Sequence, residues 1–313
     1  MKIRVNASRN LATFMALTGL FMANLLSAQA SEPPVKQEGQ ANLASRREVP
    51  SPIYGVTIDA IDSLPSIVES LTKLSRRPTT RIVFDEYVPA SDYLAATKSI
   101  YNVSYVMGEI LDSFYVKKYT LTAFKKRVAD YLKTLAPYVD LWEVANEVNG
   151  EWLGKTTTVV PKMTAAYDAV KAINGKTVLT LYYNKDCWSN SKNEMFTWAT
   201  ANVPSRMKLG LDYVLVSYYE DDCNGYQPDW PVEFAKLAKL FPNSKIGFGE
   251  VGTSNSSLKA SYINRYYNTK INLPTYVGGY FWWYYKQDMV PYTKPLWTTL
   301  NNAIAASERT EQD

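Results

Sequence analysis

Eight short apolar runs alternate with stretches of helical periodicity along most of this chain. Uninterrupted apolar runs of this length are typical of parallel strands that are buried on both faces. Strands and helices in alternation fold either into an open doubly wound sheet or into a closed barrel. We expect a closed (β/α)8 TIM barrel, because no glycine-rich phosphate fingerprint follows any of the eight runs. The expected strands cover residues 53–58, 81–84, 102–107, 139–145, 178–182, 213–218, 246–248 and 277–284.

Amphipathic stretches between these runs predict the helices. The clearest covers residues 121–135, where Thr120 is suited to cap the first turn. Its apolar side chains at helical spacing are Phe124, Val128, Tyr131 and Leu135. The pattern is weakest for the helices that follow the second and the seventh expected strands. The other expected helices cover residues 64–74, 165–173, 194–200, 232–240, 259–267 and 296–306.

The N-terminal residues have the composition of a targeting segment. Residues 1–30 combine a basic start, an apolar run from Leu11 to Leu26 and the small-residue pattern Ala28-Gln29-Ala30. These three features are typical of a secretory signal peptide that is cleaved after export. An uncleaved anchor is the alternative, because the apolar run approaches the length that spans a bilayer. Cleavage predicts a secreted or periplasmic protein without stable membrane association.

The rest of the chain divides into a linker, a domain and a tail. Residues 31–50 are polar and are expected to form a disordered linker. Residues 51–306 have the size of one barrel domain, and residues 307–313 form a polar tail. Without the 3 basic residues of the signal, 31 Lys and Arg face 30 Asp and Glu. This balance does not indicate a nucleic-acid partner, and a monomer is the expected state.

A glutamate stands two residues after the fourth and after the seventh expected strand. Glu147 closes the segment Leu141-Trp-Glu-Val-Ala-Asn-Glu147, and Glu250 closes Lys245-Ile-Gly-Phe-Gly-Glu250. In a barrel, the C-terminal strand ends form one rim, where function concentrates. The chain has 0 histidines, which excludes Ser-His-Asp triads, Cys-His pairs and histidine-based zinc sites. Carboxyl groups therefore have to transfer protons near neutral pH, and we expect neither a metal nor a cofactor.

The segment Trp142-Glu-Val-Ala-Asn-Glu147 resembles the strand-4 motif of the clan A glycoside hydrolases, which are retaining β-glycosidases built on a (β/α)8 barrel. In that group, Asn-Glu ends strand 4 and a second glutamate ends strand 7. The resemblance implies that Glu147 is the acid/base, that Glu250 is the nucleophile and that Asn146 contacts the substrate 2-hydroxyl. The local text is most similar to family 39 and some family 5 enzymes. It departs from them at Ala145, where those enzymes often have an aromatic residue, and at Val148, where they often have a proline.

Arg81 matches the strand-2 arginine that lowers the pKa of the nucleophile in clan A enzymes. Strand alternation places Glu143 on the same face as Glu147, so Arg81 is also a candidate partner for a buried Glu143. Catalytic support and a structural ion pair are the two interpretations of this arginine.

Aromatic and polar residues at other strand ends are candidates for substrate binding. Trp282 and Trp283 point to opposite faces if the eighth strand is regular. The resemblance implies that one of them forms the floor of the sugar site, and Trp283 aligns better. The same resemblance implies a tyrosine beside the nucleophile at the end of strand 6, where Tyr218 and Tyr219 stand. The further candidates are Tyr218 after that strand, Tyr182 and Asn184 after the fifth, and Trp152, Trp188 and Trp230 in later loops.

Cys187 and Cys223 are the 2 cysteines of the chain. Each follows an expected strand, and the two strands are neighbours in a barrel, so both cysteines lie on loops at the same end. In an exported protein this placement favours a disulfide over two free thiols.

Together, these patterns favour a secreted retaining glycoside hydrolase that cleaves a β-linked oligo- or polysaccharide by double displacement. Two alternatives stay open: a barrel that binds polysaccharide without cleaving it, and a transglycosylase that uses the same two glutamates. Retention predicts that the carboxyl groups of Glu147 and Glu250 lie about 5–5.5 Å apart, whereas inversion predicts about 6.5–9.5 Å.

Overall fold

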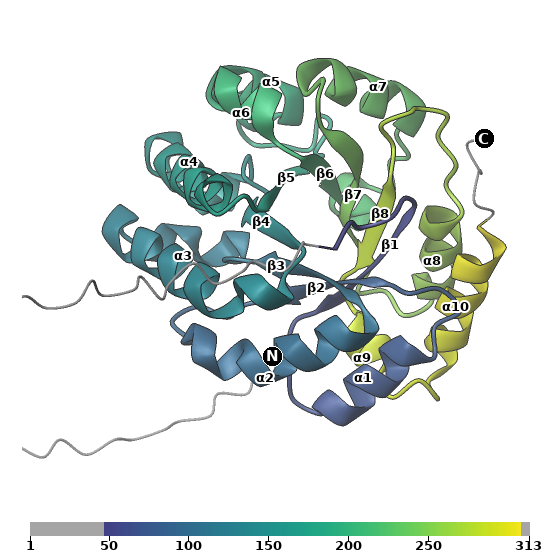
Figure 1. Cartoon of the computed structure of the whole chain (residues 1–313). Helices are drawn as coiled ribbons and strands as arrows, with labels where there is room; N and C mark the ends of the chain where they lie inside the picture. Colours follow the sequence, from purple (N-terminus) through teal and green to yellow (C-terminus); the bar gives the residue numbers. More distant parts are fainter. Residues whose placement is uncertain (1–46, 308–313) are drawn as a thin grey trace, which may run out of the picture. The chain divides into compact units, whose positions relative to one another are not determined.

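The computed structural model describes residues 47–307, which form a closed barrel of eight parallel strands in the order β1 to β8 (Figure 1). The strands are β1 (Ile53–Ile58), β2 (Thr79–Val83), β3 (Tyr105–Glu109), β4 (Leu141–Ala145), β5 (Lys176–Tyr182), β6 (Tyr213–Tyr218), β7 (Lys245–Val251) and β8 (Gly278–Trp282). The expected (β/α)8 fold is confirmed. The expected signal peptide and most of the expected linker and tail lie outside the described residues.

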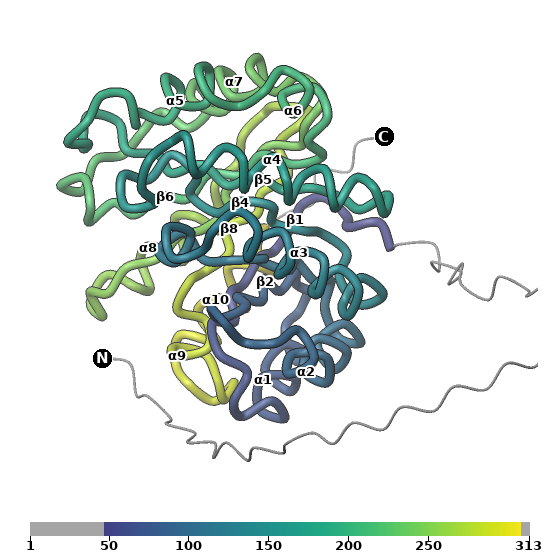
Figure 2. The backbone as a smooth tube through the Cα atoms, turned by 90° about the vertical axis from the view of Figure 1, so that its left-hand side faces the viewer, coloured from purple at the N-terminus to yellow at the C-terminus, as the bar shows by residue number. Residues whose placement is uncertain are grey.

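The helices lie around the strands, as the side view in Figure 2 also shows. The α-helices are α1 (Leu64–Thr72), α2 (Ala90–Val103), α3 (Leu121–Leu135), α4 (Thr156–Ala172), α5 (Met195–Asn202), α6 (Ser205–Gly210), α7 (Trp230–Leu240), α8 (Lys259–Tyr267), α9 (Tyr285–Met289) and α10 (Pro295–Ala306). Short 3-10 helices are η1 (Ser113–Lys118), η2 (Ala136–Tyr138), η3 (Glu151–Leu153), η4 (Ser191–Asn193) and η5 (Glu220–Cys223). The expected bounds of α3 are confirmed, and the Thr120 hydroxyl accepts a hydrogen bond from the Ala123 amide at 3.1 Å.

Helix α2 differs from the sequence-based expectation. The hydrophobic pattern predicts no helix for residues 90–103, and the third expected strand starts at residue 102, inside the last turn of α2. The buried face of α2 includes Ala96 and Thr97 beside Tyr93 and Ile100. Small and polar side chains add little to an apolar periodicity, so the helical pattern is weak even though the face is buried.

The apolar core consists of two clusters of buried side chains. The larger one packs between the strands and the helices, and the smaller one includes Ile53, Met107 and Phe281. Val49 joins this smaller cluster and is 3% exposed. The Arg47 guanidinium donates to the Asp140 carboxylate at 2.6 and 3.0 Å. Arg47 and Val49, which belong to the segment expected to be a linker, therefore pack against the barrel.

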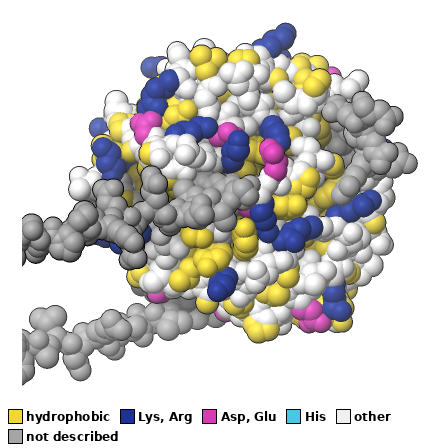
Figure 3. Space-filling model, in the orientation of Figure 1, with side chains coloured by type: hydrophobic (Ala, Val, Ile, Leu, Met, Phe, Trp, Pro, Cys, Tyr) yellow, Lys and Arg dark blue, Asp and Glu magenta, His cyan; other side chains and the backbone are white. Residues whose placement is uncertain are grey.

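The surface carries no uniform charge on the face drawn in Figure 3, where basic and acidic side chains are interspersed with hydrophobic and uncharged ones. Within residues 47–307, no helix combines the length and the apolar character needed to cross a bilayer.

Candidate active site

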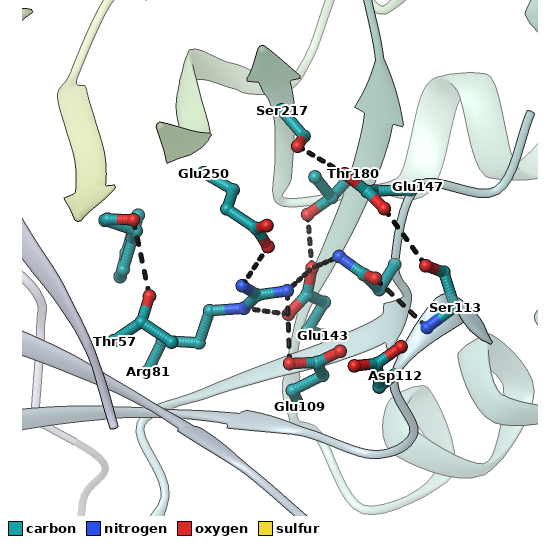
Figure 4. A network of polar contacts seen from close by, with 12 residues as sticks. Thr57, Arg81, Glu109, Asp112, Ser113, Glu143, Glu147, Thr180, Ser217 and Glu250 are labelled. Carbon is teal, nitrogen blue, oxygen red and sulfur yellow. Dashed lines mark hydrogen bonds and ion pairs between the residues drawn. The ribbon is translucent and has the colours of Figure 1, made fainter. Parts of the chain in front are cut away.

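Glu147 and Glu250 lie at the C-terminal ends of β4 and β7, and both side chains are nearly buried, with 8% and 5% exposure. Figure 4 shows the two carboxyl groups on the same side of the barrel interior, with Arg81 below Glu250 and two serines beside Glu147. The backbone of Glu147 has a φ of 45°, in the left-handed region that non-glycine residues seldom adopt. Such strain is typical of functional positions, where the surrounding structure holds a residue in an unfavourable conformation.

Glu250 pairs with a cation and a phenol. The Arg81 Nη1 donates to Glu250 Oε2, and the Tyr219 hydroxyl donates to Oε1 at 2.5 Å. Burial raises the pKa of Glu250, while Arg81 and Tyr219 act in the opposite direction because they stabilise the ionised form. The expected lowering by Arg81 is therefore present, but burial outweighs it.

Arg81 is completely buried and contacts three glutamates at once. Its Nε and Nη2 donate to the two oxygens of Glu143 at 2.7 and 3.2 Å, and Nη2 lies 3.1 Å from Glu109 Oε2. Burial raises the pKa of Glu109 well above its ordinary value, which favours the neutral acid. Arg81 therefore forms an ion pair with Glu143 and also contacts Glu250.

Glu147 is held by hydroxyl groups. Ser113 Oγ donates to Oε2 at 3.0 Å, and Ser217 Oγ lies 2.5 Å from Oε1. Within the described part of the chain, no lysine or arginine pairs with Glu147. Burial, helped by the charge of Glu250, raises the pKa of Glu147 to about 8. The two glutamates thus have different environments, and the pKa raised to about 8 favours the protonated form of Glu147 at neutral pH.

Glu147 is connected to a tryptophan through Ser113. Trp152 Nε1 lies 2.9 Å from Ser113 Oγ, and because an indole N–H is a donor only, Ser113 accepts this hydrogen bond. The Ser113 hydroxyl contacts Glu147 Oε2, and Ser217, which contacts Oε1, pairs in register with Glu250. The contact between Trp152 and Ser113 therefore helps to hold the Glu147 carboxyl group in place.

The raised pKa of Glu147 predicts a basic limit on activity. If Glu147 must be protonated to act, kcat/KM falls as the pH rises through about 8, because the acid is lost above its pKa. Measuring kcat/KM across neutral and alkaline pH checks this. In Glu147→Gln, assayed on a substrate whose leaving group needs no proton, the alkaline decline should disappear. An unchanged alkaline decline in that variant would assign the limb to another group.

Asn146 and Trp283 lie where the resemblance placed them. Asn146 Nδ2 donates to Glu143 Oε1 at 3.3 Å, and its Oδ1 accepts from the Ser113 amide at 3.1 Å. The Trp283 ring centre lies 5.8 Å from the Arg81 guanidinium carbon, next to the carboxyl cluster. These contacts bring both residues to the site.

Trp282 and Tyr218 do not line the site. Trp282 has 0% exposure, and its Nε1 donates to Asp288 at 3.0 Å, on the helical side of β8. Tyr218 is 1% exposed, and its hydroxyl donates to the Tyr226 carbonyl. In both strands alternation turns the side chain outward, so the substrate-binding roles expected for these two residues are corrected. Tyr219, one position later, is the tyrosine that contacts Glu250.

The residues after β5 build the rim rather than the carboxyl cluster. The Asn184 amide donates to the Asn193 carbonyl at 2.9 Å and accepts from the Met195 amide at 3.2 Å, so its expected role in substrate binding is replaced by one in shaping a loop. The Tyr182 hydroxyl donates to Asp222 at 2.8 Å, which ties the β5 and β6 loops together. Cys187 and Cys223 join the same two loops in a disulfide, with Cα atoms 5.5 Å apart.

Three residues of the carboxyl cluster were not among the expected site residues: Ser113, Ser217 and Glu109. Tyr219 was considered, but Tyr218 was chosen in its place. Alternation from Tyr218 would have found Ser217 and Tyr219 once the outward face of β6 was known. Glu109 ends β3 and pairs in register with Glu143, which only the observed strand bounds reveal. Ser113 reaches Glu147 from the start of η1, where no strand alternation marks a residue that faces the site. Among residues 47–307, the acidic side chains form no group that could hold a metal ion.

Comparison with solved structures supports the barrel architecture. Saccharomyces cerevisiae Gas2p, a mutant form in complex with laminaritetraose and laminaripentaose, superposes with a TM-score of 0.54 over 82% of this chain at 12% identity. Gas2p with laminaripentaose gives 0.54 at 14% identity, and ScGas2 with compound 6 gives 0.55 at 13%. The matched region spans 64–65% of the length of those chains. At such identity the likeness establishes the fold alone. No protein-family model and no curated protein matches this sequence.

Proposed function

We propose that this chain is a clan A retaining O-glycosyl hydrolase that cleaves a β-linked oligo- or polysaccharide. The observation that carries the proposal is the contrast between two carboxyl groups at one rim. Glu250 accepts from the Arg81 guanidinium and from Tyr219, which suits a nucleophile that must be ionised. Glu147 has hydroxyl partners and a pKa raised to about 8, which suits a proton donor.

In the proposed first step, the Glu250 carboxylate attacks the anomeric carbon while the proton of the neutral Glu147 carboxyl group moves to the departing glycosidic oxygen. This forms a covalent glycosyl-enzyme and leaves Glu147 ionised. In the second step, Glu147 removes a proton from water, which attacks the anomeric carbon and releases Glu250. The Ser217 hydroxyl suits this cycle, because it can accept from the neutral acid and donate to the carboxylate.

The resemblance to family 39 and some family 5 enzymes stays confined to one short segment, and the comparisons add no support for it. The laminari-oligosaccharides bound by Gas2p make β-glucans the first substrates to test. A transglycosylase would use the same two glutamates with a sugar acceptor in place of water. Export is part of the proposal, and the Cys187–Cys223 disulfide supports it, because disulfides persist in oxidising compartments.

The test is to incubate the protein with a panel of laminari-, cello- and mannooligosaccharides, with and without added acceptor sugar. We expect cleavage of at least one series, with the β-anomer as the first product. A fluoroglycoside of the accepted sugar should then trap the intermediate, detected by mass spectrometry as a modified peptide that contains Glu250. Elongated products would favour the transglycosylase. Binding without cleavage of any series would favour the non-catalytic barrel.

A further inference from the structure

Tyr87 combines backbone strain with unusual exposure. It lies in the loop between β2 and α2, with a φ of 62°, and its side chain is 65% exposed. Among the exposed large hydrophobic residues of the described chain, this is the highest value. A left-handed backbone is unfavourable for an aromatic residue, and an exposed ring gains little from burial. The fold therefore holds this ring in solvent at a cost in stability.

The ring of Tyr87 is fixed from one side. It stacks on Tyr119 with the ring centres 5.0 Å apart and the planes 13° from parallel. The Tyr87 amide donates to the Tyr119 hydroxyl at 2.7 Å, and the Tyr87 hydroxyl donates to the Lys118 carbonyl at 3.3 Å. One face is thus covered, and the high exposure belongs to the opposite face and edges. A rigid ring of this kind binds a flat apolar surface with little loss of conformational entropy.

The position of Tyr87 relates it to the two catalytic glutamates. The exposed aromatic residues of the described chain, Tyr87, Phe114 and Tyr226, all lie in loops that follow strands, after β2, β3 and β6. These loops lie on the rim that carries Glu147 and Glu250. The other large exposed hydrophobic residues are aliphatic and belong to helices: Leu94, Leu121, Leu209 and Val232. Phe114 directly follows Ser113, which contacts Glu147.

We propose that Tyr87 is a distal sugar-binding subsite, where the free face of its ring stacks on the apolar face of a pyranose unit. This inference rests on the proposed function and extends it to substrate length. Tyr87 lies 6 residues beyond Arg81, which limits its distance from the carboxyl cluster to at most about 20 Å. Its contacts are with Tyr119 and Lys118 and not with the carboxyl cluster, so the proposed subsite lies beyond the sugar that is bound between the two glutamates. The subsite therefore selects a β-linked chain of several units.

The test compares long and short substrates in Tyr87→Ala and Tyr87→Phe. For Tyr87→Ala we expect kcat/KM on the longest oligosaccharide of the accepted series to fall by about tenfold, the upper size of one stacking contact. Activity on the aryl glycoside of the same sugar should stay unchanged. Tyr87→Phe keeps the ring and should retain most activity on both substrates. Leu209→Ala, on α6 with 58% exposure, is the matched control and should affect neither substrate.

The outcomes separate the two proposals. The decisive quantity is kcat/KM on the longest oligosaccharide divided by kcat/KM on the aryl glycoside. If this ratio is the same in the wild type and in Tyr87→Ala, and both proteins are active, the subsite is overturned and the proposed glycosidase activity is not. Parallel losses on both substrates would also overturn it, since they indicate a general effect on the loop. A wild-type protein that cleaves no member of the panel overturns the proposed function and the subsite with it.

Discussion

Replacing Glu250 with glutamine should stop turnover while leaving the fold in place. The change keeps the shape of the side chain but removes the charge that attacks the anomeric carbon, so the covalent intermediate cannot form. The loss in kcat should exceed the about 10²–10⁴-fold that a general acid–base group typically supplies. Steady-state kinetics on the best oligosaccharide of the panel measure it. Circular dichroism verifies that the barrel is retained.

Two controls give this result its meaning. Glu69→Gln makes the same chemical change on the surface of α1, where the side chain is 52% exposed and pairs with Lys73, and should leave kcat unchanged. In Glu250→Ala, added azide should enter the space of the missing carboxylate and restore turnover with a glycosyl azide product of inverted configuration. Full activity in Glu250→Gln would contradict the assignment of the nucleophile. Activity lost in both glutamine variants would point to damage of the protein rather than of the site.

The sequence predicted the parts of the site that depend on strand order. Glu147, Glu250 and Arg81 were located from eight apolar runs, because parallel strands bring their C-terminal ends to one rim. Predictions that depended on the direction of a single side chain were less successful. Choosing Tyr218 instead of Tyr219 is an error of one residue, and one residue in a strand reverses the face.

The rest of the site arises from contacts between loops and from charge. Trp152 in η3 donates to the Ser113 hydroxyl in η1, which in turn contacts Glu147, and no periodic pattern marks such contacts. Glu109 was not recognised because a glutamate at the end of a strand is ordinarily solvated. Its burial beside Arg81 depends on the register of β2, β3 and β4, which local sequence does not specify.

Replacing Arg81 with methionine should have the largest effect on stability. The guanidinium is the cation that Glu143, Glu109 and Glu250 share inside the barrel, and its removal leaves buried carboxyl groups without compensation. Breaking a buried ion pair from one side typically costs about 3–5 kcal/mol of unfolding free energy. Guanidinium denaturation at neutral pH measures this loss. Arg206→Met is the control, because Arg206 pairs with Asp168 at the surface and should cost less than about 1 kcal/mol.

The pH dependence of this loss tests its electrostatic origin. Without Arg81, the pKa values of Glu109 and Glu250 rise further in the folded protein, whereas in the unfolded chain they keep their ordinary values. At pH values between the ordinary pKa of the unfolded chain and the raised pKa of the folded variant, the folded variant binds more protons than the unfolded chain. Its free energy of unfolding therefore increases as the pH falls through this range. The difference from wild type should therefore be largest at neutral pH and smaller at mildly acidic pH. A difference that stays constant with pH would instead assign the cost to the packing of the methionine, because packing does not titrate.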